Sequence, residues 1–444
     1  MSSYFFTMGG QEPPIQLGGA VCLDGRVLPT AVRLKFLDGV HGVDSSGFRA
    51  IRNVLDIEGT SAMPHHNTVM HQILKYVPWG VFEQLVDEHR ADKHVRRLST
   101  KSQFVALLYG QLSGAVSLRE IVAGLQSHQA RLYHLGIEPV CRSTLADANA
   151  RRPWEVFGAL FSVLAGQAHR GLRRALAETT YLIDSTLFHL NTRSAHWARF
   201  SAHLCGAKLH VIYDADAEQP IYAAMSAANV NDITPAQQMP IEPGATYVFD
   251  LGYYDYRWWA KLDDAACRIV TRFKKNTPLK LVEELPVPKD SNIMSDRIGF
   301  LPARQMNNSH NPMGNAVREV RVMTETGRIL RILSNDLDAT AREIADLYKR
   351  RWAIELFFRW IKQTLKIRHF IGVSETAVRI QAIVALITYV LLRLAQAGQH
   401  VVRGPLAFAR LVRTNLMHFR RLDRLLLPDQ PIPEANKQFV LQWT

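Results

Sequence analysis

The sequence predicts an α/β protein in which helical regions flank a strand-rich middle, with roughly two to four domains in 444 residues. Three observations support this class. Helical periodicity is regular from about residue 65 to residue 170, short apolar runs rich in β-branched residues follow as far as about 335, and helical spacing returns from about 339. A hydrophobic content of 47% is that of a globular protein with a substantial core.

The excess of basic over acidic residues indicates what kind of molecule the protein binds. A net charge of +13 suggests a polyanionic partner, either nucleic acid or an acidic membrane surface. The four cysteines are scattered without metal-ligand spacing, which fits a reducing compartment. Residues 1–62 are rich in glycine and proline and do not resemble a signal peptide. We expect them to be an extension upstream of a true start at Met63, the alternative being a genuine small arm.

Residues 63–155 are expected to form a helical domain with a basic surface. Ser99 and Thr100 can cap a helix, Ser117–Glu120 has the spacing of a capping box, and Ser143 or Thr144 can cap a third helix. The region carries these basic side chains: Arg90, Lys93, Arg96, Arg97, Lys101 and Arg119. Such a domain suits binding of duplex DNA, and the alternative is a packing domain with a solvated basic face.

The middle of the chain, 156–375, begins with a helix over 153–169 and continues as strands. The expected strands are 179–190, 207–215, 219–228, 245–256, 267–273, 318–324 and 328–335. A stretch rich in proline and asparagine separates the fifth strand from the sixth. Alternation of strands and helices indicates an α/β domain.

A helix expected from near Ala339 carries "YKRRWAIELFFRWIK", residues 348–362. At about 100° per residue, the following four side chains fall within roughly 60° of one another: Tyr348, Arg351, Glu355 and Lys362. A second stripe is apolar and suits contact with a core: Leu347, Ile354, Phe358, Ile361 and Leu365. The helix therefore shows a basic face that holds one acid, and the alternative is an ordinary solvated helix with an ion pair.

The C-terminal region, 376–444, is expected to be helical and basic, with a proline-rich tail. Its most apolar stretch, "IQAIVALITYVLLRLAQAG", is interrupted by Gln381, Thr388, Tyr389 and Arg393 and is short for a membrane span, so we predict a buried helix. We accordingly expect no membrane insertion.

Two further carboxylates follow apolar strand residues, in "YLID" at Asp184 and "YVFD" at Asp250. An acid at a buried strand end needs a cation or a hydrogen-bond partner, and functional sites gather at such ends. For either residue alone the alternative is a structural cap. Together with Glu355, they form a set without His or Cys partners, which favours Mg²⁺ or Mn²⁺. Two such ions can stabilise the attacking and leaving oxygens in phosphoryl transfer, while Arg and Lys hold phosphates.

These residues resemble the DDE transposases of bacterial insertion sequences, in particular the group with a Tyr-Arg-Glu-Lys signature. The resemblance covers roughly residues 65–375. Its most specific part is the spacing of Tyr348, Arg351, Glu355 and Lys362, and "FDLGYYDY" is similar to the Asp-x-Gly segment usual around the second acid.

The resemblance implies an RNase H-like catalytic core over 156–375, with the first two acids on adjacent strands, the Glu on a following helix and a β-rich insertion at about 265–335. It also implies cut-and-paste transposition: metal-dependent strand cleavage at the element end, hairpin formation, and strand transfer into target DNA. Residues 63–155 would bind the transposon ends.

The resemblance also implies roles and partners. Asp184, Asp250 and Glu355 would be catalytic and ligate two Mg²⁺ ions, with Mn²⁺ as the alternative metal. Tyr348, Arg351 and Lys362 would contact phosphates; Trp352 would stack on an unpaired base, or else pack in the core. Trp258 and Trp259 would equally suit sheet packing or DNA contact. The partners would be terminal inverted repeats and target DNA, bound by a homodimer in a synaptic complex, in the bacterial cytoplasm at the nucleoid.

Two alternative functions use the same fold. A metal-dependent nuclease would cut DNA without joining it, and a non-catalytic repressor would only bind transposon ends. A repressor would be expected to lack an acid or to break the signature, and this sequence does neither.

Overall fold

A computed structural model describes residues 67–172, 179–201, 203–287, 289, 291–304, 310–365, 370–399 and 401–427. The predicted N-terminal extension over 1–62 and the proline-rich tail over 428–444 lie outside the described residues.

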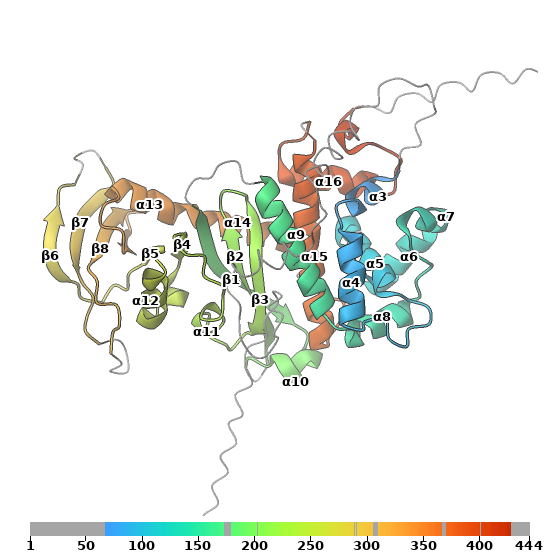
Figure 1. The fold of residues 1–444 in the computed structure, drawn as a ribbon, viewed down its shortest axis with the longest axis horizontal. Helices are drawn as coiled ribbons and strands as arrows, with labels where there is room; N and C mark the ends of the chain where they lie inside the picture. Colours follow the sequence, from blue (N-terminus) through green and yellow to red (C-terminus); the bar gives the residue numbers. More distant parts are fainter. Residues whose placement is uncertain are drawn as a thin grey trace, which may run out of the picture.

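A single nine-stranded sheet organises the middle of the chain, in the order β3-β2-β1-β4-β5-β9-β8-β7-β6 (Figure 1). The first part consists of β1 (Thr180–Leu190), β2 (Cys205–Asp214), β3 (Gln219–Ala227), β4 (Thr246–Phe249) and β5 (Arg268–Arg272). Strands β1, β4 and β5 run parallel to one another, β2 pairs antiparallel with β1, and β3 pairs antiparallel with β2. All five strands match segments expected from the sequence.

The second part of the sheet continues from β5 without a break. It consists of β6 (Lys280–Leu285), β7 (Ile293–Phe300), β8 (Val317–Met323) and β9 (Ile329–Ser334), all antiparallel, with β9 paired to β5. Strands β6 and β7 lie in the stretch that was expected only to separate strands. Strand β6 forms the exposed edge, so it lacks the buried apolar run by which a strand is recognised in a sequence.

The N-terminal region is helical, as predicted. Its helices are α3 (Val69–Leu74), α4 (Trp79–Glu88), α5 (Thr100–Ser113), α6 (Leu118–Ser127), α7 (Gln129–Leu132), α8 (Arg142–Arg151) and α9 (Glu155–Leu172). Ser99 caps α5 and Ser117 caps α6 through the expected side-chain hydrogen bonds. The third cap prediction is wrong: α8 begins at Arg142, before Ser143 and Thr144, and Cys141 is its N-cap residue without a side-chain bond.

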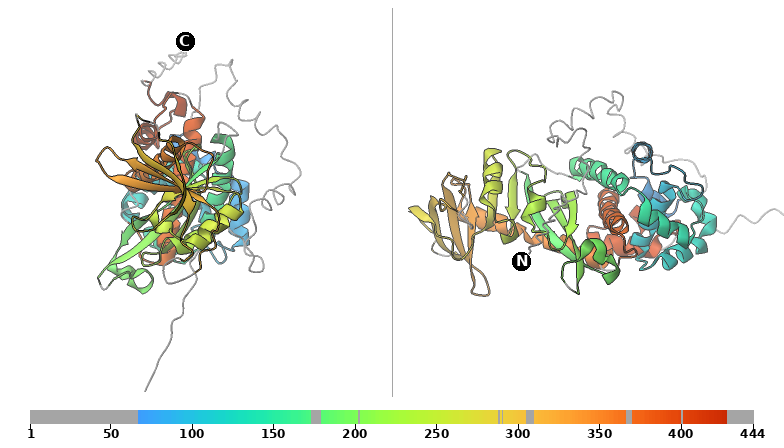
Figure 2. Two further views of the ribbon diagram at one scale, coloured as in Figure 1. Left: turned by 90° about the vertical axis from the view of Figure 1, so that its left-hand side faces the viewer. Right: turned by 90° about the horizontal axis from the view of Figure 1, so that it is seen from below.

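The C-terminal helices complete the helical half of the molecule. They are α15 (Glu375–Ala397) and α16 (Pro405–Asn415). Helix α15 is long and apolar enough to cross a membrane, but 89% of its most apolar window is buried inside the protein, so the prediction of a buried helix is confirmed. It packs against α5, α8, α9 and β3, between the N-terminal helices and the sheet (Figures 1 and 2). The sheet and the helices thus lie side by side along the long axis.

Candidate active site at the carboxylate cluster

Asp184 and Asp250 occupy neighbouring strands. Ile183 pairs with Phe249 in the parallel register of β1 and β4, so the next residue on each strand is an aspartate. Asp250 follows the end of β4, and its carboxylate accepts a hydrogen bond from the N–H of Gly252 at 2.8 Å. The expectation that Asp184 ends its strand is wrong: β1 continues to Leu190 because β2 pairs with it throughout.

The signature segment forms two helices where one was predicted. They are α13 (Ala341–Arg350) and α14 (Trp352–Thr364). Around Arg351 the backbone bonds span three residues, from Arg351 N–H to Tyr348 and from Ile354 N–H to Arg351, and these bonds tighten the turn. The predicted apolar stripe is nonetheless buried throughout: Leu347, Ile354, Phe358, Ile361 and Leu365. Burial of this stripe leaves Glu355 and Arg351 facing the strand ends.

Arg351 joins the first acid to the third. Its guanidinium lies 3.3 Å from Asp184 Oδ2 and 2.5 Å from Glu355 Oε1, and it stands 5.8 Å from the centre of the Tyr348 ring. The bridge explains how a glutamate on α14 is held beside an aspartate on β1. Three members of the signature therefore meet in space.

The carboxyl group of Asp184 is protonated more readily than an ordinary aspartate. Burial is the main reason that the pKa of Asp184 is raised to about 7; the charges of Asp250 and Glu355 also raise this pKa, while the Ser185 N–H and Arg351 lower it. Removal from water thus disfavours the charged form of this carboxyl group more than the neighbouring charges do. In the free protein the positive charge of Arg351 partly balances the negative charges of these carboxylates.

The donor set fits a hard divalent cation, because all three side chains offer carboxylate oxygens. Their present arrangement is not closed around an ion: within the described part of the chain, no three His, Cys, Asp or Glu side chains are grouped so that they could hold a metal. Arg351 contacts both Asp184 and Glu355. A metal bound by these acids therefore has to replace that guanidinium.

Lys362 and Trp352 take different positions on α14. The Lys362 ammonium lies 5.4 Å from the centre of the Phe188 ring. Phe188 is four residues beyond Asp184 on β1 and thus on the same face of the sheet. Trp352 is 52% exposed, so core packing is wrong for this residue. Trp258 and Trp259 are buried, as expected of residues that pack against the sheet.

Two residues near the site were missed in the sequence. Arg272 ends β5, the parallel neighbour of β4, and its charge acts on the Tyr348 hydroxyl. Asp232 follows β3; it accepts hydrogen bonds from Ser185 Oγ at 2.9 Å and Lys208 Nζ at 3.0 Å. A charged residue at or just after a strand end was the signal that identified Asp250. Arg272 carries this signal, whereas Asp232 lies beyond the end of β3 at Ala227, and the sequence gives no comparable signal for it.

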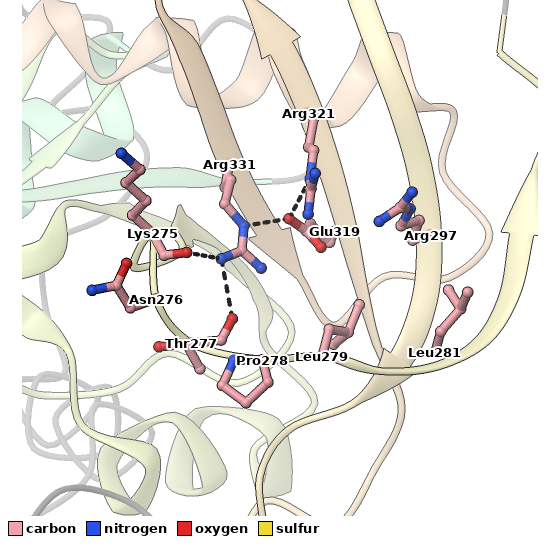
Figure 3. Close-up of a pocket in the computed structure, with 10 residues that line it drawn as sticks. All are labelled: Lys275, Asn276, Thr277, Pro278, Leu279, Leu281, Arg297, Glu319, Arg321 and Arg331. Atoms are coloured by element: carbon pink, nitrogen blue, oxygen red, sulfur yellow. Dashed lines mark hydrogen bonds and ion pairs between the residues drawn. The ribbon is translucent and has the colours of Figure 1, made fainter.

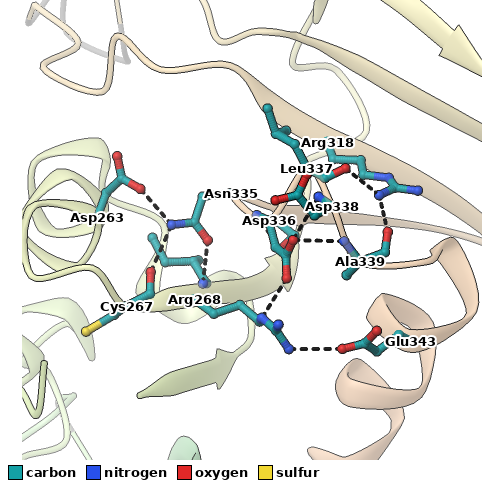
Figure 4. A network of polar contacts seen from close by, with 12 residues as sticks. Asp263, Cys267, Arg268, Arg318, Asn335, Asp336, Leu337, Asp338, Ala339 and Glu343 are labelled. Carbon is teal, nitrogen blue, oxygen red and sulfur yellow. Dashed lines mark hydrogen bonds and ion pairs between the residues drawn. The ribbon is translucent and has the colours of Figure 1, made fainter. Parts of the chain in front are cut away.

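A polar network that joins β5, β8 and the segment before α13 fixes where α13 begins (Figure 4). Arg318 of β8 binds both carboxylate oxygens of Asp296, at 2.8 and 2.7 Å, and donates to the carbonyl oxygens of Leu337 and Ala339. Arg268 binds Asp336 at 2.7 Å and Glu343 at 3.1 Å. The sheet thereby positions the helix that carries Tyr348.

Comparison with known families places these residues in a recognised domain. The family model described as "Transposase DDE domain" matches residues 176–391, which include Asp184, Asp250 and Glu355. A second model, described as a domain of unknown function, matches residues 65–138.

Individual relatives extend the match. A protein of Sinorhizobium fredii named as a transposase is 40% identical over 293 residues, which make up 66% of this chain and 82% of that protein. A protein of Geobacillus stearothermophilus, named as a transposase for an insertion sequence element, is 28% identical over 261 residues, 56% of this chain and 66% of that protein. A solved piggyBac transposase synaptic complex with hairpin DNA gives a TM-score of 0.38 and 10% identity, covering 79% of this chain and 78% of that one. At that score the similarity supports no conclusion.

Proposed function

Because this chain belongs to the DDE transposases of bacterial insertion sequences, we propose that it moves its element by a cut-and-paste reaction. The proposed steps are strand cleavage at the element ends, hairpin formation and strand transfer into target DNA. One observation carries the proposal: Asp184 and Asp250 are adjacent on parallel strands, and Arg351 brings Glu355 beside Asp184. Adjacent acids on a sheet with a glutamate on a following helix are also what an RNase H-like core requires.

Asp184, Asp250 and Glu355 are the proposed ligands of two Mg²⁺ ions, with Mn²⁺ as a substitute. Family members use divalent metal ions, and the all-oxygen donor set suits these metals. Such ions, when bound, stabilise the charge that develops on the attacking and leaving oxygens of the phosphate.

The basic residues of the signature are proposed to hold the DNA backbone. Arg351 balances Asp184 and Glu355 in the free protein, and release from these carboxylates frees its guanidinium to bind a phosphate through two parallel hydrogen bonds. Lys362 adds a positive charge beside β1, and the Tyr348 hydroxyl donates one hydrogen bond. Trp352 offers an exposed ring on which an unpaired base can stack.

The N-terminal helices are proposed to bind the terminal inverted repeats. The loop between α4 and α5 exposes four basic side chains: Arg90, Lys93, Arg96 and Arg97. Asp92 anchors this loop, because its carboxylate accepts hydrogen bonds from the N–H and the hydroxyl of Thr100 at 2.8 and 2.7 Å. A homodimer holding two ends in a synaptic complex, in the bacterial cytoplasm at the nucleoid, completes the proposal.

The test uses purified full-length chain, Mg²⁺ and duplex DNA that carries the element's own ends and flanks, with products resolved on a denaturing gel. Glu355→Gln removes one charge while keeping the shape of the side chain. Glu325→Ala, in the exposed turn between β8 and β9, is the matched control that removes a carboxylate elsewhere. A sample with EDTA shows whether the reaction depends on metal.

Nicks and hairpins at the element boundary with the wild type and Glu325→Ala, but not with Glu355→Gln or EDTA, are the expected result. Cleavage without joined products would instead identify a nuclease. Specific binding of the ends without any cleavage would identify a repressor, and cleavage by Glu355→Gln would show that the proposed metal site is wrong.

A further inference from the structure

Arg272 lies in one row with the first two acids of the carboxylate cluster. Three apolar residues of the parallel strands β1, β4 and β5 are level with one another: Leu182, Val248 and Val270. All three belong to the same apolar core as the buried stripe of α13 and α14. Side chains two residues apart on a strand point to the same face of a sheet. Asp184, Asp250 and Arg272 each follow this row by two residues, so they share the face on which α13 and α14 pack.

The backbone at the end of β5 is fixed. Arg272 pairs with Ile332 of β9, and the N–H of Phe273 donates to the carbonyl oxygen of Arg331 at 2.8 Å. In a cavity on the opposite face of the sheet, the Arg331 guanidinium donates to three carbonyl oxygens of the segment 274–277 (Figure 3). The Arg272 side chain therefore extends from an anchored strand end toward the face that carries the acids.

The Arg272 guanidinium is unpaired among the residues that the structure describes. Its Nε is buried without a hydrogen bond, and no partner for its terminal nitrogens is found in the same part of the chain. Arg268, four residues earlier on the same strand, instead binds Asp336 and Glu343. A buried donor without an acceptor costs free energy, and an incoming anion would recover that cost. Arg272 is only partly buried, so an anion can reach it.

The Tyr348 hydroxyl lies within electrostatic range of Arg272. Burial raises the pKa of Tyr348, the positive charges of Arg351 and Arg272 lower this pKa, and the charge of Asp250 raises it. Two guanidinium groups thus act on one hydroxyl, but they differ in the free protein. Arg351 is held by two carboxylates, whereas Arg272 is available before any metal binds.

We infer that Arg272, together with the Tyr348 hydroxyl, binds a backbone phosphate of the DNA strand that is held at the carboxylate cluster. The inference rests on the proposed function and adds to it a basic residue outside the signature. Adjacent strands are about 4.8 Å apart, which is between one and two nucleotide steps of about 3.4 Å. The phosphate is therefore within two steps of the one that reacts beside Asp250. The guanidinium fork matches two phosphate oxygens, which give the unpaired N–H groups their acceptors.

The first test measures binding of the full-length chain to a labelled element-end duplex by fluorescence anisotropy, in EDTA and over a range of salt concentrations. Arg272→Gln removes the guanidinium, and Arg272→Lys keeps the charge without the fork. Arg342→Gln, at an exposed position at the far end of α13, is the control that makes the identical change away from the acids. Thermal unfolding verifies that each variant folds and measures its stability.

We expect Arg272→Gln to weaken end binding about tenfold and to reduce the salt slope by about 0.9, the change for one lost phosphate contact. Arg272→Lys should recover part of the affinity, and Arg342→Gln should match the wild type. The melting temperature of Arg272→Gln should equal or exceed that of the wild type, because the variant loses a cation that is unpaired in the free protein. A lower melting temperature, with weak binding that Arg272→Lys does not restore, would overturn the inference by showing a structural role.

A second experiment locates the phosphate. Single methylphosphonate substitutions neutralise each phosphate around the cleavage position in turn, and binding by the wild type and by Arg272→Gln is compared on every duplex. One substitution is expected to weaken binding by the wild type but not by Arg272→Gln, because the two changes remove the same contact. Equal losses for both proteins at every position would overturn the direct contact while the transposase proposal stands.

Three other outcomes are distinguishable. Affinity and salt slope of Arg272→Gln equal to those of Arg342→Gln would overturn the phosphate contact alone. Stabilisation of the wild type but not of Arg272→Gln by inorganic phosphate, with end binding unchanged, would assign Arg272 to a small anion and overturn the DNA contact. A wild type that binds no element-end DNA would refute the proposed function itself.

Discussion

Arg351 is the side chain on which the geometry of the cluster depends. Its guanidinium contacts carboxylates from β1 and α14 at once, although Asp184 and Glu355 are far apart in the chain. Two contacts in different directions require a planar fork, which a lysine ammonium lacks. A lysine at this position keeps the positive charge of Arg351 but not its planar fork, so it tests the geometry of the side chain separately from its charge.

We predict that Arg351→Lys lowers the rate of strand cleavage about a hundredfold, a loss comparable to that of one oriented donor in an active site. The gel assay on element ends measures it. Arg342→Lys makes the same change at an exposed position of α13 and should cleave at the wild-type rate. Equal rates for the two variants would mean that charge alone is sufficient at Arg351.

His210 is a second residue whose protonation depends on the fold. It is fully buried on β2, and its Nε2 lies 2.8 Å from Ser226 Oγ. Burial lowers its pKa from 6.5 to about 4, with Asp232 opposing the shift and Lys208 adding to it. The unfolded state therefore binds the proton more tightly than the folded state. Above about pH 6.5 His210 does not change the free energy of unfolding, and as the pH falls from about 6.5 toward 4 its titration lowers that free energy.

We predict that the titration of His210 lowers the free energy of unfolding by about 2 kcal/mol between about pH 7.5 and pH 5. This value follows from the lowered pKa of the buried imidazole. Urea unfolding at both pH values measures the total change. In His210→Gln, whose amide can still reach Ser226, the pH-dependent loss should be smaller by that amount. An identical loss in both proteins would show that His210 titrates normally.

At the scale of elements, the start of α13 depends on a buried ion pair between β7 and β8. The Arg318 and Asp296 side chains are 6% and 2% exposed, and Arg318 also binds the carbonyl oxygens that precede the helix (Figure 4). Removing one partner of such a pair leaves the other charge buried and unpaired. The helix that carries Tyr348 would then lose its anchor on the sheet.

We predict that Arg318→Leu lowers the free energy of unfolding by about 3 to 5 kcal/mol, the usual cost of an orphaned buried charge. Denaturant unfolding measures it. The double variant Arg318→Leu with Asp296→Leu should recover most of this loss, because it removes both charges. Its cleavage rate should remain low, since the bonds to Leu337 and Ala339 are still missing.

At the scale of the whole molecule, α15 joins the N-terminal helices to the sheet. It contacts α5, α8 and α9 on one side and β3 on another, and its residues belong to the same apolar core as both halves. The C-terminal region thus stabilises elements that are encoded some 200 to 300 residues earlier. Unfolding of the two halves is expected to be cooperative.

We predict that Ile383→Ala, at a fully buried position of α15, costs about 2 to 5 kcal/mol of stability. Far-ultraviolet circular dichroism and tryptophan fluorescence should report the same shifted transition in urea. Leu406→Ala, at a position on α16 that is 40% exposed, should change stability by less than about 0.5 kcal/mol. Separate transitions for the two probes would show that the halves fold independently.

The sequence determined the features that depend on neighbouring residues. Periodicity predicted the apolar stripe of α13 and α14 and the burial of α15, and side-chain chemistry predicted the caps at Ser99 and Ser117. Strand-forming runs predicted β1 to β5, β8 and β9. Strand β6 was not predicted because an exposed edge strand has no buried face to produce an alternating pattern. Helix α8 begins earlier than the predicted capping residues indicated.

Only the tertiary structure decided which residues meet. The register of β1 against β4 sets Asp184 beside Asp250, the Arg351 guanidinium joins Asp184 to Glu355, and the pairing of β8 with β9 makes Arg321 and Arg331 share Glu319. These contacts join residues that are close in space but not in the chain. A sequence records local preference directly, whereas strand register and helix packing result from minimising the energy of the whole core.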